Sequence, residues 1–158
     1  MSEALPKYAL LEVERRWLVL ASSLPSLEGL PHRVIEDHYL PGGQLRLRLV
    51  NETGRPPIFK LGKKYGPVTG VSRPVVSLYL TEREAITLRQ VCARSARKRR
   101  YSLQSGALDV YVQPEHPFAI FEVEFPNVQL AAAYCPPAFV AREVTNDEDY
   151  NGFALAAK

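Results

Sequence analysis

The chain has 158 residues, 46% of them apolar, which is enough for one domain with a sizeable core. Its 20 basic and 17 acidic residues give a formal net charge of +3 and a pI near 8.9, which gives no reason to expect nucleic acid as a partner. No apolar run approaches the ~18 residues of a membrane-spanning helix, and two cysteines are too few for a disulfide framework or a cysteine-rich metal site.

The first residues carry an early acid and no apolar stretch, so they do not resemble a signal peptide. This and the low cysteine content predict a cytoplasmic protein with no membrane partner. The length predicts a single domain over residues 1–158. The oligomeric state, monomer or homodimer, stays open at this stage.

The chain is predicted to form many short strands and few helices. Pro41-Gly42-Gly43 is a turn signal between two strands, and Thr81 with Glu84 forms a capping box that begins a helix running to Cys92. Many short strands around one core favour a mainly β (α+β) barrel or sandwich. The expected strands are 8–20, 33–40, 44–50, 58–64, 72–80, 94–102, 108–113 and 119–125, and the expected short helices are 129–134 and part of 147–158.

Charged residues alternate with apolar ones in these strands, and residues i and i+2 of a strand share a face. The spacing charge-x-charge, with a single sign each time, occurs four times where the opposite face is largely apolar. A solvated sheet face is the ordinary explanation for any one such strand. The pairs are Glu12 and Glu14, Arg46 and Arg48, Lys98 and Arg100, and Glu122 and Glu124.

A second interpretation explains why the signs are segregated. If eight strands close into a barrel, its interior is wide enough for one small ligand, and charges inside it must pair or bind a ligand. Carboxylates are the hard ligands that Mg²⁺ prefers, and arginine offers phosphate a bidentate fork. The pattern therefore favours a charged ligand, with acids for a divalent cation and bases for a polyanion.

Six motifs, in order along the chain, resemble those of the CYTH superfamily, the triphosphate tunnel metalloenzymes. Glu12-Val13-Glu14-Arg15-Arg16 is similar to the family's ExExK signature, in the context EVERRWLV. The others are Tyr39-Leu40 followed by Leu45-Arg46-Leu47-Arg48; Phe59-Lys60-Leu61; Lys98-x-Arg100-Tyr101; Leu108-Asp109-Val110-Tyr111 with Phe121-Glu122-Val123-Glu124-Phe125; and Glu143-Val144-Thr145 with Tyr150-Asn151.

The resemblance implies an eight-stranded antiparallel closed barrel with a few outer helices, and divalent-metal-dependent hydrolysis of inorganic triphosphate or a related polyphosphate. The motifs are most similar to those of small bacterial tripolyphosphatases. Two alternatives stay open: an enzyme for an organic triphosphate, either a thiamine triphosphatase or a class IV adenylyl cyclase, and a non-catalytic binder of polyphosphate or nucleotide.

The resemblance also implies roles for individual residues. The cofactor would be Mg²⁺ or Mn²⁺, and Arg16, Lys98 and Tyr39 would be catalytic. The metal ligands would be Glu12, Glu14, Asp109, Glu122 and Glu124, and the triphosphate would bind Arg16, Arg46, Arg48, Lys60, Lys98 and Arg100.

The chain departs from the family pattern at four places. Arg16 stands where the signature has lysine, and the two side chains are not interchangeable. Residues 73–77 lack the glutamates that usually follow the arginine there, and Gly152 stands near an expected asparagine. Lys63 and Lys64 add charge beside Lys60, and the sequence does not decide which of the three faces the interior.

Overall fold

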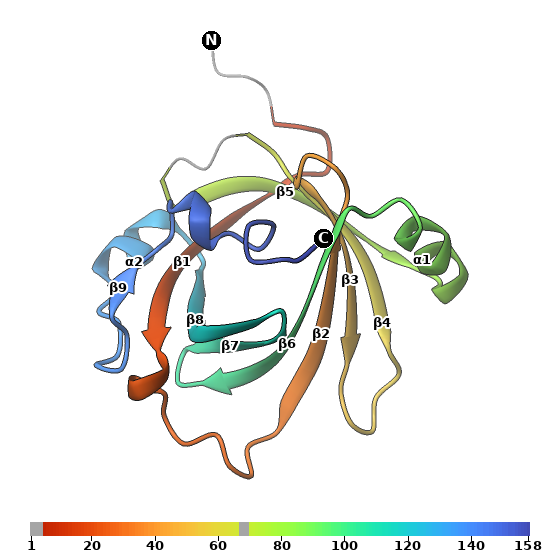
Figure 1. The fold of residues 1–158 in the computed structure, drawn as a ribbon. Coiled ribbons are helices and arrows are strands. Elements are labelled where there is room, and N and C mark those ends of the chain that lie inside the picture. Colours follow the sequence, from red (N-terminus) through yellow and green to blue (C-terminus); the bar gives the residue numbers. More distant parts are fainter. Residues whose placement is uncertain (1–4, 67–69) are drawn as a thin grey trace.

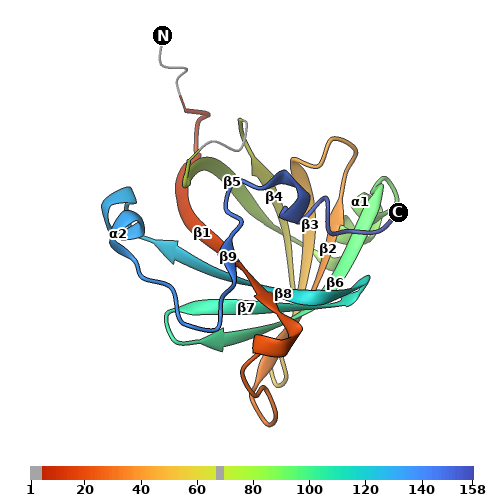
Figure 2. The same cartoon turned by 60° about the vertical axis from the view of Figure 1, so that its left-hand side comes forward.

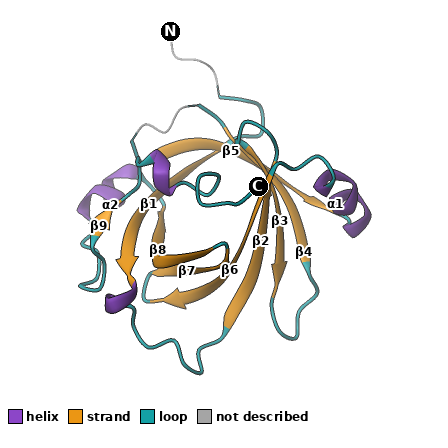
Figure 3. Ribbon diagram, viewed as in Figure 1, coloured by secondary structure: helices purple, strands orange, loops and turns teal. Residues whose placement is uncertain are grey.

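The computed structural model describes residues 5–66 and 70–158. Its strands form a ring, and helices α1 and α2 lie outside that ring (Figures 1 and 3). The barrel strands are β1 (Leu10–Leu20), β2 (His32–Tyr39), β3 (Leu45–Asn51), β4 (Ile58–Lys64), β5 (Ser72–Leu80), β6 (Arg94–Leu103), β7 (Gly106–Gln113) and β8 (Glu115–Phe125), and the remaining elements are η1 (Ala21–Ser23), α1 (Glu82–Arg89), α2 (Val128–Ala133), β9 (Arg142–Glu143) and η2 (Glu148–Tyr150).

All neighbouring strands in the barrel are antiparallel, in the order β5-β4-β3-β2-β6-β7-β8-β1. The first part of β1 closes the ring by pairing with β5, with Leu10 opposite Val75. The later part of the same edge pairs with β9, where Trp17 lies opposite Glu143 (Figure 2). The predicted eight-stranded antiparallel barrel is confirmed, with β9 as one additional short strand.

The helices cover the outside of the barrel at two places. Helix α1 contacts β3, β4 and β5, and its predicted capping box is present, since Thr81 accepts from the backbone of Glu84 and Glu84 accepts from the backbone of Thr81. Helix α2 contacts β1 and β8. None of the helices in the described part of the chain is long and apolar enough to cross a membrane.

An apolar cluster forms the outer core beside α2. Trp17, 2% exposed, contacts the rings of Phe121 and Tyr134, and Arg15 stacks on its indole while pairing with Glu143. Because Arg15 follows Glu14 in the strand, its outward position leaves Glu14 facing the interior. This packing fixes which side of β1 faces inward.

A second apolar cluster fills one end of the barrel interior. It joins the inward-facing Leu18, Tyr39 and Tyr111 to Leu155 and Ala156 of the C-terminal segment, which lies across the barrel opening in Figure 1. The short helix predicted within 147–158 is present as the three-residue 3-10 helix η2, and the rest of the segment is irregular. The backbone of this segment instead follows the surface it covers, with Arg94 donating to the carbonyl of Phe153.

Candidate functional site

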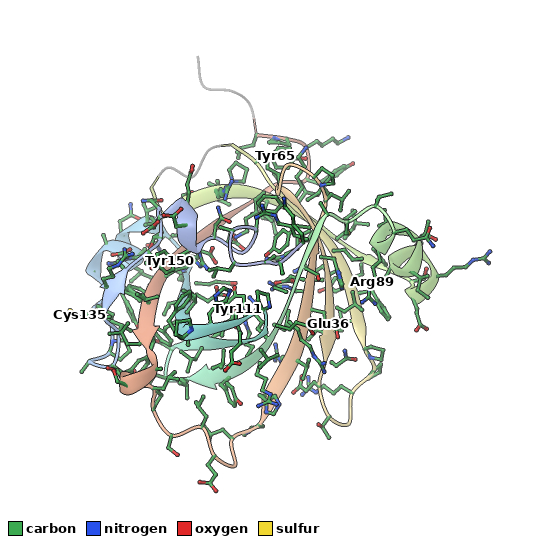
Figure 4. The ribbon with its side chains drawn as sticks, in the orientation of Figure 1. Glu36, Tyr65, Arg89, Tyr111, Cys135 and Tyr150 are labelled. Carbon is green, nitrogen blue, oxygen red and sulfur yellow. The ribbon has the colours of Figure 1, made fainter. Side chains whose placement is uncertain are left out.

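The rest of the barrel interior is a charged cavity of about 380 Å³. Alternation along the strands brings the predicted inward-facing residues into its lining. Figure 4 shows one of the lining residues, Tyr111, inside the ring of strands. The basic lining residues are Arg16, Arg46, Arg48, Lys60, Lys64, Arg73, Lys98 and Arg100, and the acidic ones are Glu12, Glu14, Glu122, Glu124 and Glu148.

Three glutamates on two adjacent strands form a carboxylate cluster, comprising Glu12, Glu14 and Glu124. The backbone pairs Glu14 of β1 with Glu124 of β8, and one carboxylate oxygen from each of the three residues lies within 4.8 Å of the others. Burial raises the pKa of Glu124, and the charges of Glu12 and Glu14 raise it further. Such crowding of like charges is relieved when a cation binds.

Lys64 of β4 extends into this cluster. Its Nζ lies 2.5 Å from Oε2 of Glu12 and 3.1 Å from Oε1 of Glu14. Lys60 and Lys64 line the cavity, whereas Lys63 lies over the ring of Tyr65. The pairing of β3 with β4 explains why Lys60 and Lys64 face the cavity, because Lys60 lies opposite the inward-facing Arg48.

A belt of alternating charges runs round the interior from β3 to β1; we call it the ion-pair belt. At its first end, Arg48 donates from Nε and Nη2 to both oxygens of Asp37, at 2.6 and 2.8 Å. Nε of Arg46 lies 3.7 Å from the same carboxylate, and Nζ of Lys98 lies 3.6 Å from it. Asp37 is only 2% exposed.

The belt continues through a second buried aspartate, Asp109. Lys98 Nζ lies 2.6 Å from its Oδ2, and Arg100 donates to both of its oxygens at 2.7 Å. Arg100 also donates to Glu122, and Nε of Arg16 lies 3.6 Å from the other oxygen of Glu122. The belt therefore joins five neighbouring strands, β3, β2, β6, β7 and β8, and ends on β1.

The belt keeps its groups charged despite their burial. Burial raises the pKa of Asp37, Asp109 and Glu122, but the arginines and Lys98 beside them lower it more, so each pKa is below its usual range. Burial likewise lowers the pKa of Arg16, yet Glu122 and other nearby groups raise it above its usual value. Arg16 is therefore a permanent cation, suited to electrostatic stabilisation and not to proton transfer.

One donor beside the cavity lacks a partner in the part of the chain that the structure describes. The buried Nε of Arg46 has no hydrogen-bond partner among the described residues, and buried donors without partners are costly. Burial lowers the pKa of Lys60, and the charges of Arg48 and Arg46 lower it further. This concentration of positive charge would bind an anion that supplies several oxygens.

Tyr39 and Tyr111 form the boundary between the cavity and the apolar cluster. Burial raises the pKa of Tyr39 to about 12, so its hydroxyl stays protonated and could donate a hydrogen bond to a ligand. A Cβ at residue 152 would lie 2.0 Å from that hydroxyl, which explains why glycine stands there. Lys98 lies over the ring of Tyr111, with Nζ 5.5 Å from the centroid.

The structure divides the predicted metal ligands into two groups. Glu12, Glu14 and Glu124 come together in the carboxylate cluster, whereas Asp109 and Glu122 bind the cations of the belt. All the basic residues predicted to bind triphosphate line the cavity, as do the three residues predicted to be catalytic.

Several residues of the site were missed by the sequence reasoning, notably Asp37. It precedes Tyr39 by two positions in a strand, so it shares the inward face of that residue. Alternation could therefore have identified it, and the same rule could have placed Tyr111 beside Asp109. Arg73, which binds the carbonyls of Tyr65 and Gly66, was seen only as part of a departing motif.

Comparison with known proteins gives matches at the level of structure. No protein-family model matches the sequence, and no curated protein does. Two crystal structures of NE1496, one described as a hypothetical protein and the other as an inorganic triphosphatase, are each 26% identical to this chain with a TM-score of 0.58. Each alignment covers 92% of this chain, and 96% or 93% of the other.

The chain has the tunnel fold of the CYTH superfamily. The ordered motifs, the barrel and these neighbours agree on this point. In the tunnel, the carboxylate cluster lies on β1 and β8, and the start of the ion-pair belt lies on β2 and β3. Strand β2 is four strands away from β1 in either direction round the ring, so the two features face each other across the cavity.

Proposed function

We propose that this protein hydrolyses inorganic triphosphate or a related short polyphosphate inside the tunnel, with a divalent metal ion, Mg²⁺ or Mn²⁺. The observation that carries the proposal is the cavity itself, in which the carboxylate cluster faces cations contributed by separate strands. The triphosphatase description of NE1496, whose fold this chain shares, supports the same substrate class.

The carboxylate cluster fits a hard divalent cation. Its ligand atoms are carboxylate oxygens within 4.8 Å of one another, which is the donor type that Mg²⁺ and Mn²⁺ prefer. Glu12, Glu14 and Glu124 would hold the ion. When bound, it would neutralise phosphate charge and polarise the phosphoryl group that is transferred.

The cations of the tunnel would bind and orient the substrate. Arg46, Arg48 and Lys60 present donors from β3 and β4, and Arg16, Lys98 and Arg100 present theirs from β1 and β6. Phosphoryl transfer depends chiefly on positioning and on stabilising charge at the transferring group. We therefore assign Arg16 and Lys98 to electrostatic stabilisation and Tyr39 to hydrogen-bond donation, with water as the nucleophile.

The test is a screen of the purified protein for release of orthophosphate and pyrophosphate from triphosphate, pyrophosphate, ATP and thiamine triphosphate, each with Mg²⁺ or Mn²⁺ and with a chelator. The proposal expects turnover of triphosphate above the other substrates, and its loss with the chelator. Preference for thiamine triphosphate, or for ATP with formation of cyclic AMP, would replace it with an organic-triphosphate enzyme. Binding without turnover of any substrate would replace it with a receptor.

Lys64 is expected to compete with the metal ion. Its ammonium contacts both Glu12 and Glu14, so a divalent ion entering the cluster would meet a like charge. Lys64→Met should therefore tighten binding of Mn²⁺ alone by about three- to tenfold, measured by titration with electron paramagnetic resonance detection. Lys63→Met, which removes the same charge from the outer face, is the control and should leave Mn²⁺ affinity unchanged. Weaker Mn²⁺ binding by Lys64→Met would show that Lys64 supports the site.

A further inference from the structure

Asp37 is a buried acid next to the surface that would bind phosphate. It lies behind Arg46, Arg48 and Lys98, which we call the cation wall, and these three side chains line the cavity. Neither the motifs nor the proposed metal site uses Asp37. A carboxylate that is 2% exposed beside three cations has a role beyond solvation.

The contacts of Asp37 leave the wall able to bind a ligand. Its two oxygens accept from Nε and Nη2 of Arg48, and a guanidinium carries five N–H donors, so others remain. Lys98 is shared with Asp109 at the shorter distance of 2.6 Å, and Nε of Arg46 has no hydrogen-bond partner in the described chain. Asp37 therefore offsets part of the positive charge without occupying all the donors.

We propose that Asp37 is a resident counter-ion that weakens the hold of the cation wall on phosphate groups, so that orthophosphate and pyrophosphate leave after hydrolysis. The naming of these two products rests on the proposed function, whereas the effect on anion affinity does not. Two negative charges about 6 Å apart in a partly buried site, here the carboxylate of Asp37 and a bound phosphate, repel strongly enough to weaken phosphate binding at least tenfold. A wall without Asp37 would bind any phosphate more tightly.

A purely orienting role for Asp37 gives the opposite expectation. If its only contribution were to fix the guanidinium of Arg48, its removal would loosen the wall and weaken the binding of every anion. A purely structural role would lower the stability of the barrel and give no gain in affinity. The sign of the change in affinity therefore decides between the counter-ion and both rival roles.

The experiment compares Asp37→Asn with Glu36→Gln. Glu36, labelled in Figure 4, is the preceding residue on β2, and its carboxylate lies 3.8 Å from Nε of Arg97 on the outer side of the strand. Glu36→Gln therefore removes the same negative charge at a position away from the cavity. Calorimetric titration with orthophosphate and pyrophosphate should show at least tenfold tighter binding by Asp37→Asn and no change for Glu36→Gln. Unchanged or weaker orthophosphate binding by Asp37→Asn would overturn the proposal.

Steady-state kinetics give a second test of whether Asp37→Asn binds phosphate groups more tightly. With triphosphate as substrate, Asp37→Asn should lower kcat and KM together, because products leave slowly and the ground state binds tightly. A raised KM would overturn the counter-ion role. If the wild-type protein shows no triphosphatase activity, the proposed function fails, while the titration with orthophosphate still tests Asp37.

A second background keeps the test valid if Asp37→Asn does not fold. The double variant Asp37→Asn/Arg46→Gln removes one charge of each sign, so the wall keeps its net charge. Compared with Arg46→Gln alone, the double variant should bind orthophosphate at least tenfold more tightly. Equal or weaker binding by the double variant would contradict the counter-ion role.

Discussion

Replacing Glu124 with glutamine should reduce metal-dependent triphosphate hydrolysis at least ~100-fold while leaving the barrel folded. The change preserves shape but removes one of the three carboxylates that surround the proposed metal site. A metal acting as a Lewis acid supplies several kcal/mol of transition-state stabilisation, and ~1.4 kcal/mol corresponds to tenfold in rate. The comparison is kcat/KM at saturating Mg²⁺, together with the affinity for Mn²⁺ in the absence of substrate.

The free energy of unfolding of Glu124→Gln should be close to that of the wild-type protein. Glu124 is exposed, and the charges of Glu12 and Glu14 help to raise its pKa, so loss of its charge relieves repulsion. Glu115→Gln is the matched control, because Glu115 is an exposed glutamate at the other end of β8. An active Glu124→Gln variant with unchanged Mn²⁺ affinity would remove the carboxylate cluster from the mechanism.

Replacing Arg100 with methionine should cost ~3–5 kcal/mol of unfolding free energy at neutral pH. Methionine keeps the apolar stem but removes the guanidinium that binds Asp109 and Glu122. Asp109 is 1% exposed, so it would be left buried with one cation fewer. The measurement is equilibrium unfolding in urea, with Arg99→Met as the control. Arg99 is the adjacent exposed residue of β6, and its replacement should change stability by less than ~0.5 kcal/mol.

The loss caused by Arg100→Met should also depend on pH. The pKa values of Asp109 and Glu122 lie below their usual range in the folded protein. Their paired charges therefore stabilise the wild-type fold above the unfolded-state pKa near ~4, and this stabilisation is lost as pH falls towards the folded-state pKa. The stability difference between wild type and variant should thus shrink below about pH 4. A difference that is constant from pH 7 to pH 3 would indicate lost packing instead of lost charge pairing.

Much of the barrel follows from a two-residue period. Because Glu12, Glu14, Arg46 and Arg48 alternate with neighbours that are apolar except for Arg15, burying one face fixes the position of the other, and the structure places all four in the cavity. The choice between Lys60, Lys63 and Lys64 was only weakly indicated by the sequence, because in β4 only Phe59 and Leu61 mark the face opposite Lys60. It depends on register, through the pairing of Lys60 with Arg48.

The sequence also could not predict which acids join the ion-pair belt and which join the carboxylate cluster. Glu122 and Glu124 share a face two residues apart, yet Glu122 joins the ion-pair belt and Glu124 the carboxylate cluster. Which partner each glutamate meets depends on the neighbouring strands, where Glu122 lies opposite Arg16 and Glu124 opposite Glu14. The path of the tail after η2 was not predicted for a related reason, since its conformation depends on contacts with Tyr39 and other residues distant in sequence.

We expect the cavity to hold a triphosphate between the carboxylate cluster and the cation wall. A crystal structure with Mn²⁺ and the non-hydrolysable imidotriphosphate, with anomalous data collected at the manganese edge, tests it most directly. We expect the anomalous peak to show a manganese ion coordinated by Glu12, Glu14 and Glu124. The bound anion should extend from that ion to Arg46 and Arg48. Manganese bound away from these glutamates, or an anion bound outside the barrel, would contradict the account.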